Sequence, residues 1–264
     1  MDKQRLDLLV VDRGLAVSRS QAQRLIYAGE VLVDGQIVDK PGTPVPISAS
    51  IEAKAKPRYV SRGGEKLEAA LARFPVGVEG VVAADVGAST GGFTDCLLQH
   101  GARKVYAIDV GYGQLAWTLR QDARVVVMER VNARYLDRLP EPIGLIVSDV
   151  SFISLRLIYA TAVNWLAPTG EVVSLIKPQF EAGPRYVGKG GVVRDPEVHR
   201  QVLVEVARTM GALGLGLNGL MASPLVGPAG NVEFLGWWRW AQAGSDAEPW
   251  IEEALAEAAR RRGG

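Results

Sequence analysis

The chain has 264 residues, of which 48% are hydrophobic and 22% charged, a composition typical of a globular protein and not of a disordered one. The 30 basic and 29 acidic residues give a formal net charge of +1, which neither favours nor excludes nucleic acid as a partner. No apolar run is long enough to span a membrane, and one cysteine with two histidines offers neither a disulfide nor a typical zinc site, so we expect a cytoplasmic protein without bound metal.

Residues 1–53 predict a small domain of two short helices and a small sheet. Apolar residues indicate a first helix over residues 5–13. A second helix begins at Ser18, where Gln21 completes a capping box, and ends at Gly29. Its apolar residues fall on one face, so Arg19, Gln23 and Arg24 are free to face outward.

Asp34-Gly35 lies between two short apolar runs and predicts a hairpin with a type I′ turn, and a last strand is expected around residues 50–53. Two short helices on a small sheet, with arginines on the second helix, resemble the S4-type RNA-binding domain. The matching residues are Arg5-Leu6-Asp7, Ser18-Arg19, Ala22 and 29–35. The resemblance implies phosphate contacts with structured RNA; without it, the arginines form an ordinary solvated helix face.

Residues 54–60 predict a charged, proline-containing linker, and residues 61–264 a large domain. The stretch 61–66 leads into leucines and alanines at helical spacing, so Lys66 stands in the first turn of a helix. The helix dipole disfavours a cation at that position. Lys66 therefore indicates a role other than solubility.

The large domain is organised around the glycine-rich stretch 85–94, which follows an apolar run and precedes a helical one. This order predicts a strand, a glycine turn and a helix N-terminus that approaches a ligand. The next apolar run ends in Asp109, where an acid can bind both hydroxyls of a ribose. The turn departs from the dinucleotide fingerprint, and Asp85 before it suits a ligand with an amino group. These features favour S-adenosylmethionine over a dinucleotide or an ordinary glycine turn.

Later apolar runs predict further strands and helices in alternation. The remaining strands are expected at residues 124–128, 144–148, 171–176, 217–222 and 231–240. Helices are expected at residues 154–166 and 196–213, with a surface helix over 250–264. This alternation indicates an α/β, Rossmann-like, doubly wound sheet, and seven strands fit the class I methyltransferase variant, whose last strand is antiparallel.

Four charged residues occupy positions where an unpaired charge is costly. Asp149 and Lys177 each end a buried strand, at the edge where open α/β sheets bind ligands. Glu233 lies inside an apolar run, and Lys66 is the fourth residue. Two lysines and two acids can form a purely structural network, but their position beside the glycine turn favours a catalytic set.

These four residues resemble the Lys-Asp-Lys-Glu set of FtsJ-like ribose 2′-O-methyltransferases. With the S4-like domain, the stretches 61–67, 85–95, 148–154 and 177–181 are similar to the TlyA family, also labelled hemolysin A. The resemblance implies methylation of cytidine ribose 2′-hydroxyls in 16S or 23S ribosomal RNA, or both. It also implies S-adenosylmethionine as cofactor and ribosomal RNA or ribosomal subunits as partners, with no membrane.

A ribose hydroxyl becomes a nucleophile when a base removes its proton. Lys177 is the expected base, because desolvation and the nearby Lys66 favour a neutral amine; Asp149 would hold Lys177, and Glu233 would orient Lys66 or the ribose. The expected cofactor contacts are Asp85, Gly87, Ala88, Ser89, Gly91, Gly92, Phe93, Asp109, Val110, Asn132 and Asp149. The expected RNA contacts are Arg5, Arg19, Arg24, Arg62, Arg185, Tyr186 and Lys189.

Some alternatives stay open at this point. The loop 185–191 is either an ordinary flexible loop or closes over an extruded nucleotide with Tyr186 stacked on a base. The hemolysin label suggests a membrane-active cytolysin, although no amphipathic inserting segment is visible. A ribosome assembly factor with an inactive catalytic set and a dinucleotide-dependent oxidoreductase are the other two alternatives.

Overall fold

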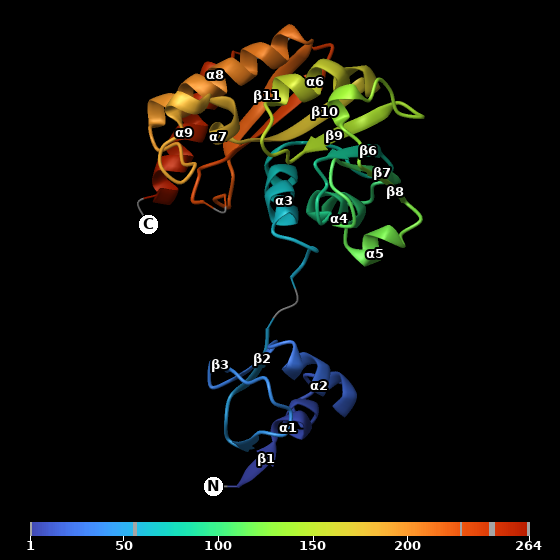
Figure 1. Cartoon of the computed structure of the whole chain (residues 1–264), viewed down its shortest axis with the longest axis vertical. Helices are drawn as coiled ribbons and strands as arrows, with labels where there is room; N and C mark the ends of the chain where they lie inside the picture. The colour runs from blue at the N-terminus through green and yellow to red at the C-terminus, as the bar shows by residue number, and fades with distance from the viewer. Residues whose placement is uncertain (1, 55–56, 228, 243–245, 263–264) are drawn as a thin grey trace. The chain divides into compact units, whose positions relative to one another are not determined.

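The computed structural model describes residues 2–54, 57–227, 229–242 and 246–262. The chain divides into two compact units, Met1–Pro57 and Arg58–Gly264 (Figure 1). The predicted linker at 54–60 contains residues 55 and 56, and the predicted last helix contains residues 263 and 264; these four lie outside the described residues. Within the described ranges, no helix combines the length and hydropathy that a membrane span requires.

The N-terminal unit packs two helices against short strands. Its elements are β1 (Lys3–Arg5), α1 (Leu6–Asp12), α2 (Arg19–Tyr27), β2 (Val31–Val33), β3 (Gln36–Ile37), β4 (Pro44–Pro46) and β5 (Ile51–Ala53). Asp34 and Gly35 have φ angles of 48° and 78°, which confirms the predicted type I′ turn between β2 and β3. The pairing of β1 with β4 was not predicted, because both strands are short and carry no alternating pattern.

The second helix has the predicted cap, and two of its polar side chains bond to the first helix. Ser18 Oγ accepts a hydrogen bond from Gln21 N at 3.3 Å, so the predicted cap is present. Arg19 is exposed, as expected, and the side chains of Arg19 and Gln23 each donate to the carboxylate of Asp7 at 2.9 Å. Asp7 is fully buried, and a buried carboxylate requires such partners. Arg24 is exposed, as expected.

The C-terminal unit contains a seven-stranded sheet in the order β11-β12-β10-β9-β6-β7-β8. The strands are β6 (Val82–Val86), β7 (Lys104–Asp109), β8 (Val125–Glu129), β9 (Ile143–Ser148), β10 (Leu166–Ile176), β11 (Leu215–Ala222) and β12 (Phe234–Trp240). Strands β6 to β10 are parallel, whereas β12 is antiparallel to both of its neighbours. The predicted sheet with an antiparallel last strand is confirmed.

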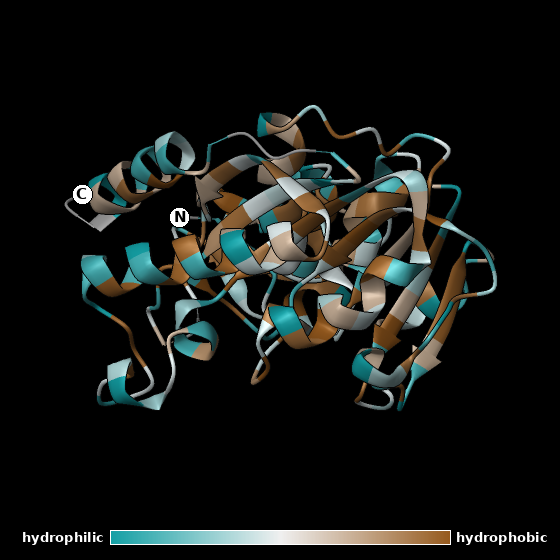
Figure 2. Cartoon of the chain, turned by 90° about the horizontal axis from the view of Figure 1, so that it is seen from above, coloured by the Kyte–Doolittle hydropathy of each residue, from teal (hydrophilic) through white to brown (hydrophobic). Residues whose placement is uncertain are grey.

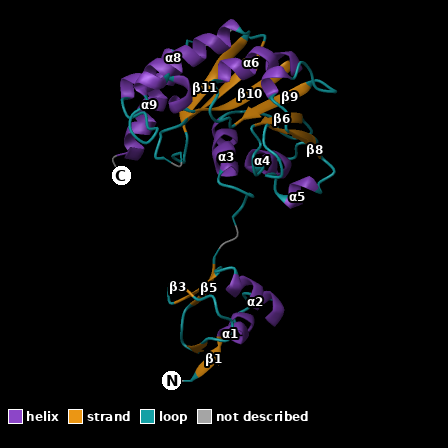
Figure 3. Ribbon diagram, in the orientation of Figure 1, coloured by secondary structure: helices purple, strands orange, loops and turns teal. Residues whose placement is uncertain are grey.

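Helices cover both faces of this sheet (Figures 1 and 3). One face carries α3 (Gly63–Arg73), α4 (Gly92–Gln99) and α5 (Trp117–Arg120), and the other carries α6 (Leu155–Ala162), α8 (Pro196–Ala212) and α9 (Glu248–Arg262). Neighbouring residues of β10 alternate between the two hydrophobic clusters, with Val172 in one and Val173 in the other. Figure 2 shows the hydrophobic residues concentrated in the strands. Because both faces are covered, the strands read as continuous apolar runs.

Several strands begin at residues other than those predicted, and the differences are largest for β10 and β12. β10 begins at Leu166 instead of Glu171, with an irregular register between these residues. This irregularity accommodates Pro168, which has no N–H for the ladder. β12 begins at Phe234, so Glu233 lies just before the strand and not inside it.

Candidate active site

The topology of the sheet brings separate strand ends to one edge. In the parallel part, Val86 of β6 pairs with Ile108 of β7 and with Ser148 of β9. β12 runs in the opposite direction, so its beginning lies at the same edge, with Phe234 opposite Ile176 of β10. The residues that follow β9 and β10 and the residue that precedes β12 are therefore neighbours. These residues are Asp149, Lys177 and Glu233.

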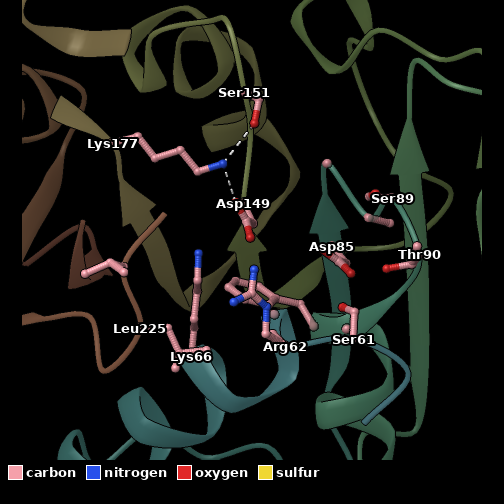
Figure 4. Close-up of a pocket in the computed structure, with 16 residues that line it drawn as sticks. Ser61, Arg62, Lys66, Asp85, Ser89, Thr90, Asp149, Ser151, Lys177 and Leu225 are labelled. Carbon is pink, nitrogen blue, oxygen red and sulfur yellow. Dashed lines mark hydrogen bonds and ion pairs between the residues drawn. The ribbon is translucent and has the colours of Figure 1, made fainter. Parts of the chain in front are cut away.

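Lys177 forms an ion pair with Asp149, with 2.6 Å between Nζ and Oδ1. Its Nζ also donates to Ser151 Oγ at 2.9 Å (Figure 4). The side chains of Lys177 and Asp149 are only 11% and 24% exposed. The end of β10 is thus tied to the loop that follows β9 by one ammonium group.

Lys66 forms the second ion pair, with 2.6 Å between its Nζ and Glu233 Oε2. The side chains of Lys66 and Glu233 are 11% and 1% exposed. Gln179 Nε2 also donates to Glu233 Oε1, at 3.4 Å. Lys66 does stand in the first turn of α3, against the helix dipole, and Glu233 compensates its charge.

Three of the four charged residues line a cavity of about 300 Å³, namely Lys66, Asp149 and Lys177. Figure 4 shows the amino groups of both lysines on the same side of the pocket as Asp149, with Asp85 farther away near Ser89 and Thr90. Glu233 contacts Lys66 and belongs to the buried part of the site. Two of the cations that line the cavity, Lys66 and Lys177, are therefore each held by a carboxylate.

A cluster of buried hydroxyl groups supports these strand ends. Tyr159 OH lies 2.6 Å from Ser174 Oγ and 3.2 Å from Ser148 Oγ, and the two serine oxygens are 2.8 Å apart. Burial raises the pKa of Tyr159 to about 12, so its hydroxyl stays protonated. The cluster joins α6, β9 and β10 next to Asp149 and Lys177 and restricts their relative movement.

The glycine turn lies close to the loop after β9. Gly87 has φ of 82°, and a Cβ on it would lie 2.8 Å from the carbonyl oxygen of Asp149. Gly91 has φ of 96° and precedes α4. Both positions therefore require glycine. The turn forms one wall of the cavity through Gly87, Ala88 and Ser89.

Asp85 is fully buried at the end of β6 and lines the same cavity. Its Oδ2 accepts hydrogen bonds from Thr94 N at 2.9 Å and from Thr94 Oγ1 at 2.7 Å. Within the described part of the chain, its Oδ1 has no hydrogen-bond partner. Burial raises the pKa of Asp85 to about 7, although both bonds from Thr94 oppose this shift. Asp85 thus offers an acceptor that a cationic donor can satisfy.

A second cavity of about 480 Å³ adjoins the first and contains Asp109. Asp109 Oδ2 accepts from Ser89 N at 2.8 Å, and Oδ1 accepts from Gly111 N at 2.6 Å. Each oxygen retains a second lone pair, so the carboxylate can still accept hydrogen bonds from a ligand. Four residues line both cavities, namely Gly87, Ser89, Asp149 and Ser151. This arrangement suits a ligand that extends from one cavity into the other.

The cofactor contacts expected from the sequence are distributed over the two cavities. Those that line only the first are Asp85, Ala88, Gly92 and Phe93. Those that line only the second are Asp109, Val110 and Asn132. Of the expected contacts, Gly91 lines neither cavity, and a Cβ there would meet Leu119 at 2.3 Å. Its place in the structure is the start of α4.

The expected RNA contacts of the C-terminal unit fall into two groups. Arg62 lines the first cavity. The others are exposed, and Arg185 and Tyr186 lie in a short 3-10 helix (Pro184–Tyr186) that precedes Lys189. The guanidinium of Arg185 lies 4.7 Å from the ring centre of Tyr186. In the described residues these three line neither cavity.

Several residues of the site were missed by the sequence analysis. Ser151 and Gln179 stand two residues after Asp149 and Lys177, and this proximity is the signal that would have found them. Leu225 and Val226 line the first cavity from a loop between β11 and β12. They carry neither charge nor periodicity, so no pattern distinguishes them.

Comparisons with known proteins place these features in a family context. A family model described as FtsJ-like methyltransferase matches residues 59–240, and a model described as S4 domain matches residues 4–51. The 16S/23S rRNA (cytidine-2′-O)-methyltransferase TlyA of Mycobacterium tuberculosis is 48% identical, over 89% of this chain and 89% of its own length.

Two further relatives carry a hemolysin name. Hemolysin A of Brachyspira hyodysenteriae is 44% identical, over 88% of this chain and 98% of its own length. A solved structure of a candidate hemolysin from Streptococcus thermophilus is 43% identical and covers 100% of this chain and 98% of that chain, with a TM-score of 0.76.

The buried pair between Lys66 and Glu233 makes a testable contribution to stability. Replacing Glu233 with alanine is expected to lower the free energy of unfolding by about 3–5 kcal/mol, because Lys66 stays buried without its partner. Replacing both residues, as Lys66→Met with Glu233→Leu, is expected to recover most of this loss. Urea denaturation followed by tryptophan fluorescence measures the effect in the C-terminal unit, which contains all 6 tryptophans. A loss of unfolding free energy below about 1 kcal/mol, which is the usual contribution of a solvent-exposed ion pair, would contradict this prediction.

Proposed function

The chain belongs to the FtsJ-like methyltransferase family, and we propose that it methylates the 2′-hydroxyl of cytidine ribose in 16S or 23S ribosomal RNA, or in both. The name of the TlyA relative states this reaction for that protein. One observation carries the proposal here: two lysines, each paired with a carboxylate, reach the same cavity at the strand ends. An S4 domain precedes the methyltransferase and supplies a second surface for RNA.

The cofactor is S-adenosylmethionine, which supplies an electrophilic methyl group on a cationic sulfur when bound. The residues of the two cavities fit its parts. Asp85 Oδ1 is a buried acceptor without a partner among the described residues, as an ammonium group requires. Gly87 leaves room where a Cβ would meet the Asp149 carbonyl. We assign Asp109 to the ribose hydroxyls and Asn132 and Val110 to the neighbouring part of the second cavity.

Lys177 is assigned the role of the base that takes the ribose proton. Its Nζ is held at 2.6 Å from Asp149 and 2.9 Å from Ser151, at the wall of the cavity. The 2′ O–H bond would break with its proton passing to Nζ, while the oxygen would take the methyl group whose bond to the cofactor's sulfur breaks, leaving a neutral thioether. This role requires a neutral amine before the step.

The other three charged residues are assigned to positioning. Asp149 holds Nζ of Lys177 and faces both cavities, so it is also placed to contact the cofactor. Glu233 holds Lys66, whose ammonium can donate to the ribose oxygen and stabilise negative charge that develops there. Positioning of this kind contributes to the rate because a fixed in-line geometry replaces a random encounter.

RNA binding is assigned to both units. Arg5, Arg19 and Arg24 would contact phosphates from the N-terminal unit, and Arg62 would contact RNA at the cavity. Tyr186 with Arg185 and Lys189 would contact an extruded nucleotide from their loop. Phosphate contacts of this kind do not define a sequence, so the target nucleotide follows from the shape of the RNA and from the cavity.

The proposed reaction is tested by incubating the protein with S-adenosylmethionine carrying an isotopically labelled methyl group and with separated ribosomal subunits. We expect label on the ribose 2′-oxygen of a cytidine, located by digestion and mass spectrometry. Label on a base, or on protein alone, would refute the proposal. The absence of any transfer to RNA would favour an assembly factor without catalysis.

Replacing Lys177 with methionine is expected to reduce kcat by at least about 10²-fold, because a general base contributes about 10²- to 10⁴-fold. Dissociation constants for RNA and cofactor are expected to stay nearly unchanged. Lys104→Met is the matched control, since Lys104 also belongs to an ion pair, with Glu141 at 2.5 Å, but begins β7 at the opposite edge of the sheet. Turnover of the Lys177 variant similar to that of the Lys104 variant would show that another group takes the proton.

Cofactor affinity is expected to depend on pH through Asp85. Its pKa of about 7 in the free protein means that a cationic ligand must displace a proton at lower pH. Affinity should therefore fall as pH decreases from about 7, by up to about tenfold per pH unit, and level off above pH 7. Asp85→Asn should remove this dependence. Isothermal titration calorimetry between pH 5.5 and 8 measures the affinity of both proteins. If the affinities of the wild type and of the Asp85→Asn variant changed with pH in the same way, Asp85 would not be the group responsible.

We expect the C-terminal unit to bind the cofactor without the N-terminal unit, and the N-terminal unit to contribute mainly to RNA binding. Residues 58–264 contain their own hydrophobic clusters, so a protein lacking residues 1–57 should fold and bind S-adenosylmethionine like the full chain. Its RNA affinity should fall sharply, and activity at sub-saturating RNA should fall with it, because phosphate contacts are lost. Calorimetry and filter binding measure the two affinities. A truncated protein that methylates ribosomal RNA as efficiently as the full chain would mean that the N-terminal arginines are only a solvated surface.

A further inference from the structure

A buried carboxylate in the N-terminal unit binds three side chains. The side chain of Asp7 is 0% exposed. It accepts hydrogen bonds from Arg5 Nε at 3.1 Å, Arg5 Nη2 at 2.9 Å, Arg19 Nε at 2.9 Å and Gln23 Nε2 at 2.9 Å. Arg5 ends β1, whereas Arg19 and Gln23 lie in the first two turns of α2. Asp7 therefore joins side chains that are separate in sequence into one cluster.

The cluster contains more positive charge than is needed to neutralise the buried carboxylate of Asp7. One arginine is sufficient to neutralise a buried carboxylate, and Asp7 binds two. The hydrogen bonds from Arg5 hold the pKa of Asp7 well below its usual range, so Asp7 is ionised at neutral pH. The cluster thus carries a net charge of +1 with both guanidinium groups fixed to the same anion.

Both guanidinium groups remain available to a ligand. The side chains of Arg5 and Arg19 are 47% and 53% exposed. A guanidinium has five N–H donors, of which Arg5 uses two on Asp7 and Arg19 uses one. The remaining donors suit two-point hydrogen bonding to phosphate oxygens.

Arg5 is restrained by backbone as well as by Asp7. A Cβ on Gly42 would lie 3.1 Å from Arg5 Nη1, so the turn around Gly42 lies directly against the guanidinium. This turn is fixed by hydrogen bonds from Leu6 N to Thr43 O at 2.9 Å and from Asp7 N to Pro41 O at 3.0 Å. Arg5 is therefore held in one orientation at the surface.

We propose that Asp7 is a positioning residue for RNA binding, which holds Arg5 and Arg19 as a preorganised pair for neighbouring phosphates of the RNA backbone. The inference rests on the proposed function, because it requires RNA as the partner of this unit. Ordering a long side chain on binding costs free energy, and a pair that is already ordered avoids this cost. Asp7 thereby strengthens binding to a polyanion although it is itself negative.

The direction in which RNA affinity changes when Asp7 is replaced distinguishes positioning from an effect of net charge. Asp7→Asn removes a negative charge beside the RNA surface, and net charge alone would then strengthen binding. Positioning has the opposite consequence, since the two arginines lose their common anchor. We expect RNA affinity to fall by about 5- to 100-fold, the range for two side chains that must be ordered on binding.

The experiment measures binding of the full-length protein to ribosomal RNA at several salt concentrations. Asp12→Asn is the matched control, because Asp12 is an exposed acid on the same helix, bonded to Gln4 Nε2 at 2.6 Å. We expect the Asp7 variant to bind more weakly, with a salt dependence shallower by about 0.9 per lost phosphate contact, and the Asp12 variant to bind equally or more tightly. Equal or tighter binding by a folded Asp7 variant would overturn the inference. A wild-type protein that does not bind RNA would instead refute the proposed function.

Folding of the N-terminal unit is checked by NMR spectra of the same samples. If Asp7→Asn unfolds the unit, Arg5→Lys and Arg19→Lys decide the question, because lysine keeps the charge but loses the planar fork. Arg24→Lys is their control, since Arg24 is exposed on α2 outside the cluster. We expect weaker binding for the Arg5 and Arg19 variants only. Unchanged binding for all three would overturn the inference.

Discussion

A charge that is withdrawn from water must be paired, and this constraint determines how the active edge of the sheet is built. Lys66 in α3 requires Glu233, and Lys177 after β10 requires Asp149. Neither pair is local in sequence. Each forms because parallel strands end together and because β12 is antiparallel, which brings its first residues to the same edge. The topology of the sheet and the chemistry of the cavity therefore depend on each other.

The same constraint operates in the N-terminal unit with a different outcome. Asp7 is buried, and the cations that compensate it are partly exposed arginines. In the C-terminal unit both members of each pair are largely buried, with side-chain exposures between 1% and 24%. Burial of both partners suits chemistry that excludes water, whereas burial of the anion alone suits a surface that presents cations to a polyanion.

Much of the fold was predictable because its signals are local. Apolar runs located the strands of the large sheet, and the cost of unpaired charge singled out Lys66, Asp149, Lys177 and Glu233. Pairings between elements carry no such signal. The bonds of Arg19 and Gln23 to Asp7 depend on how α1 and α2 pack, so no sequence pattern predicted them. The start of β12 was misplaced because apolar Val232 precedes the strand and no sequence pattern marks Phe234 as its first residue.

The central claim, that the paired charges surround the reacting ribose hydroxyl, is tested most directly by a structure of the full-length protein with S-adenosylhomocysteine and a ribosomal RNA fragment that it methylates. We expect the ribose O2′ of the target cytidine within about 2.6–3.2 Å of Lys177 Nζ, the distance for proton transfer. We also expect Asp85 to bind the amino group of the cofactor product. A ribose O2′ bound by groups outside the set, with Lys177 still bonded to Asp149 and Ser151, would contradict the claim.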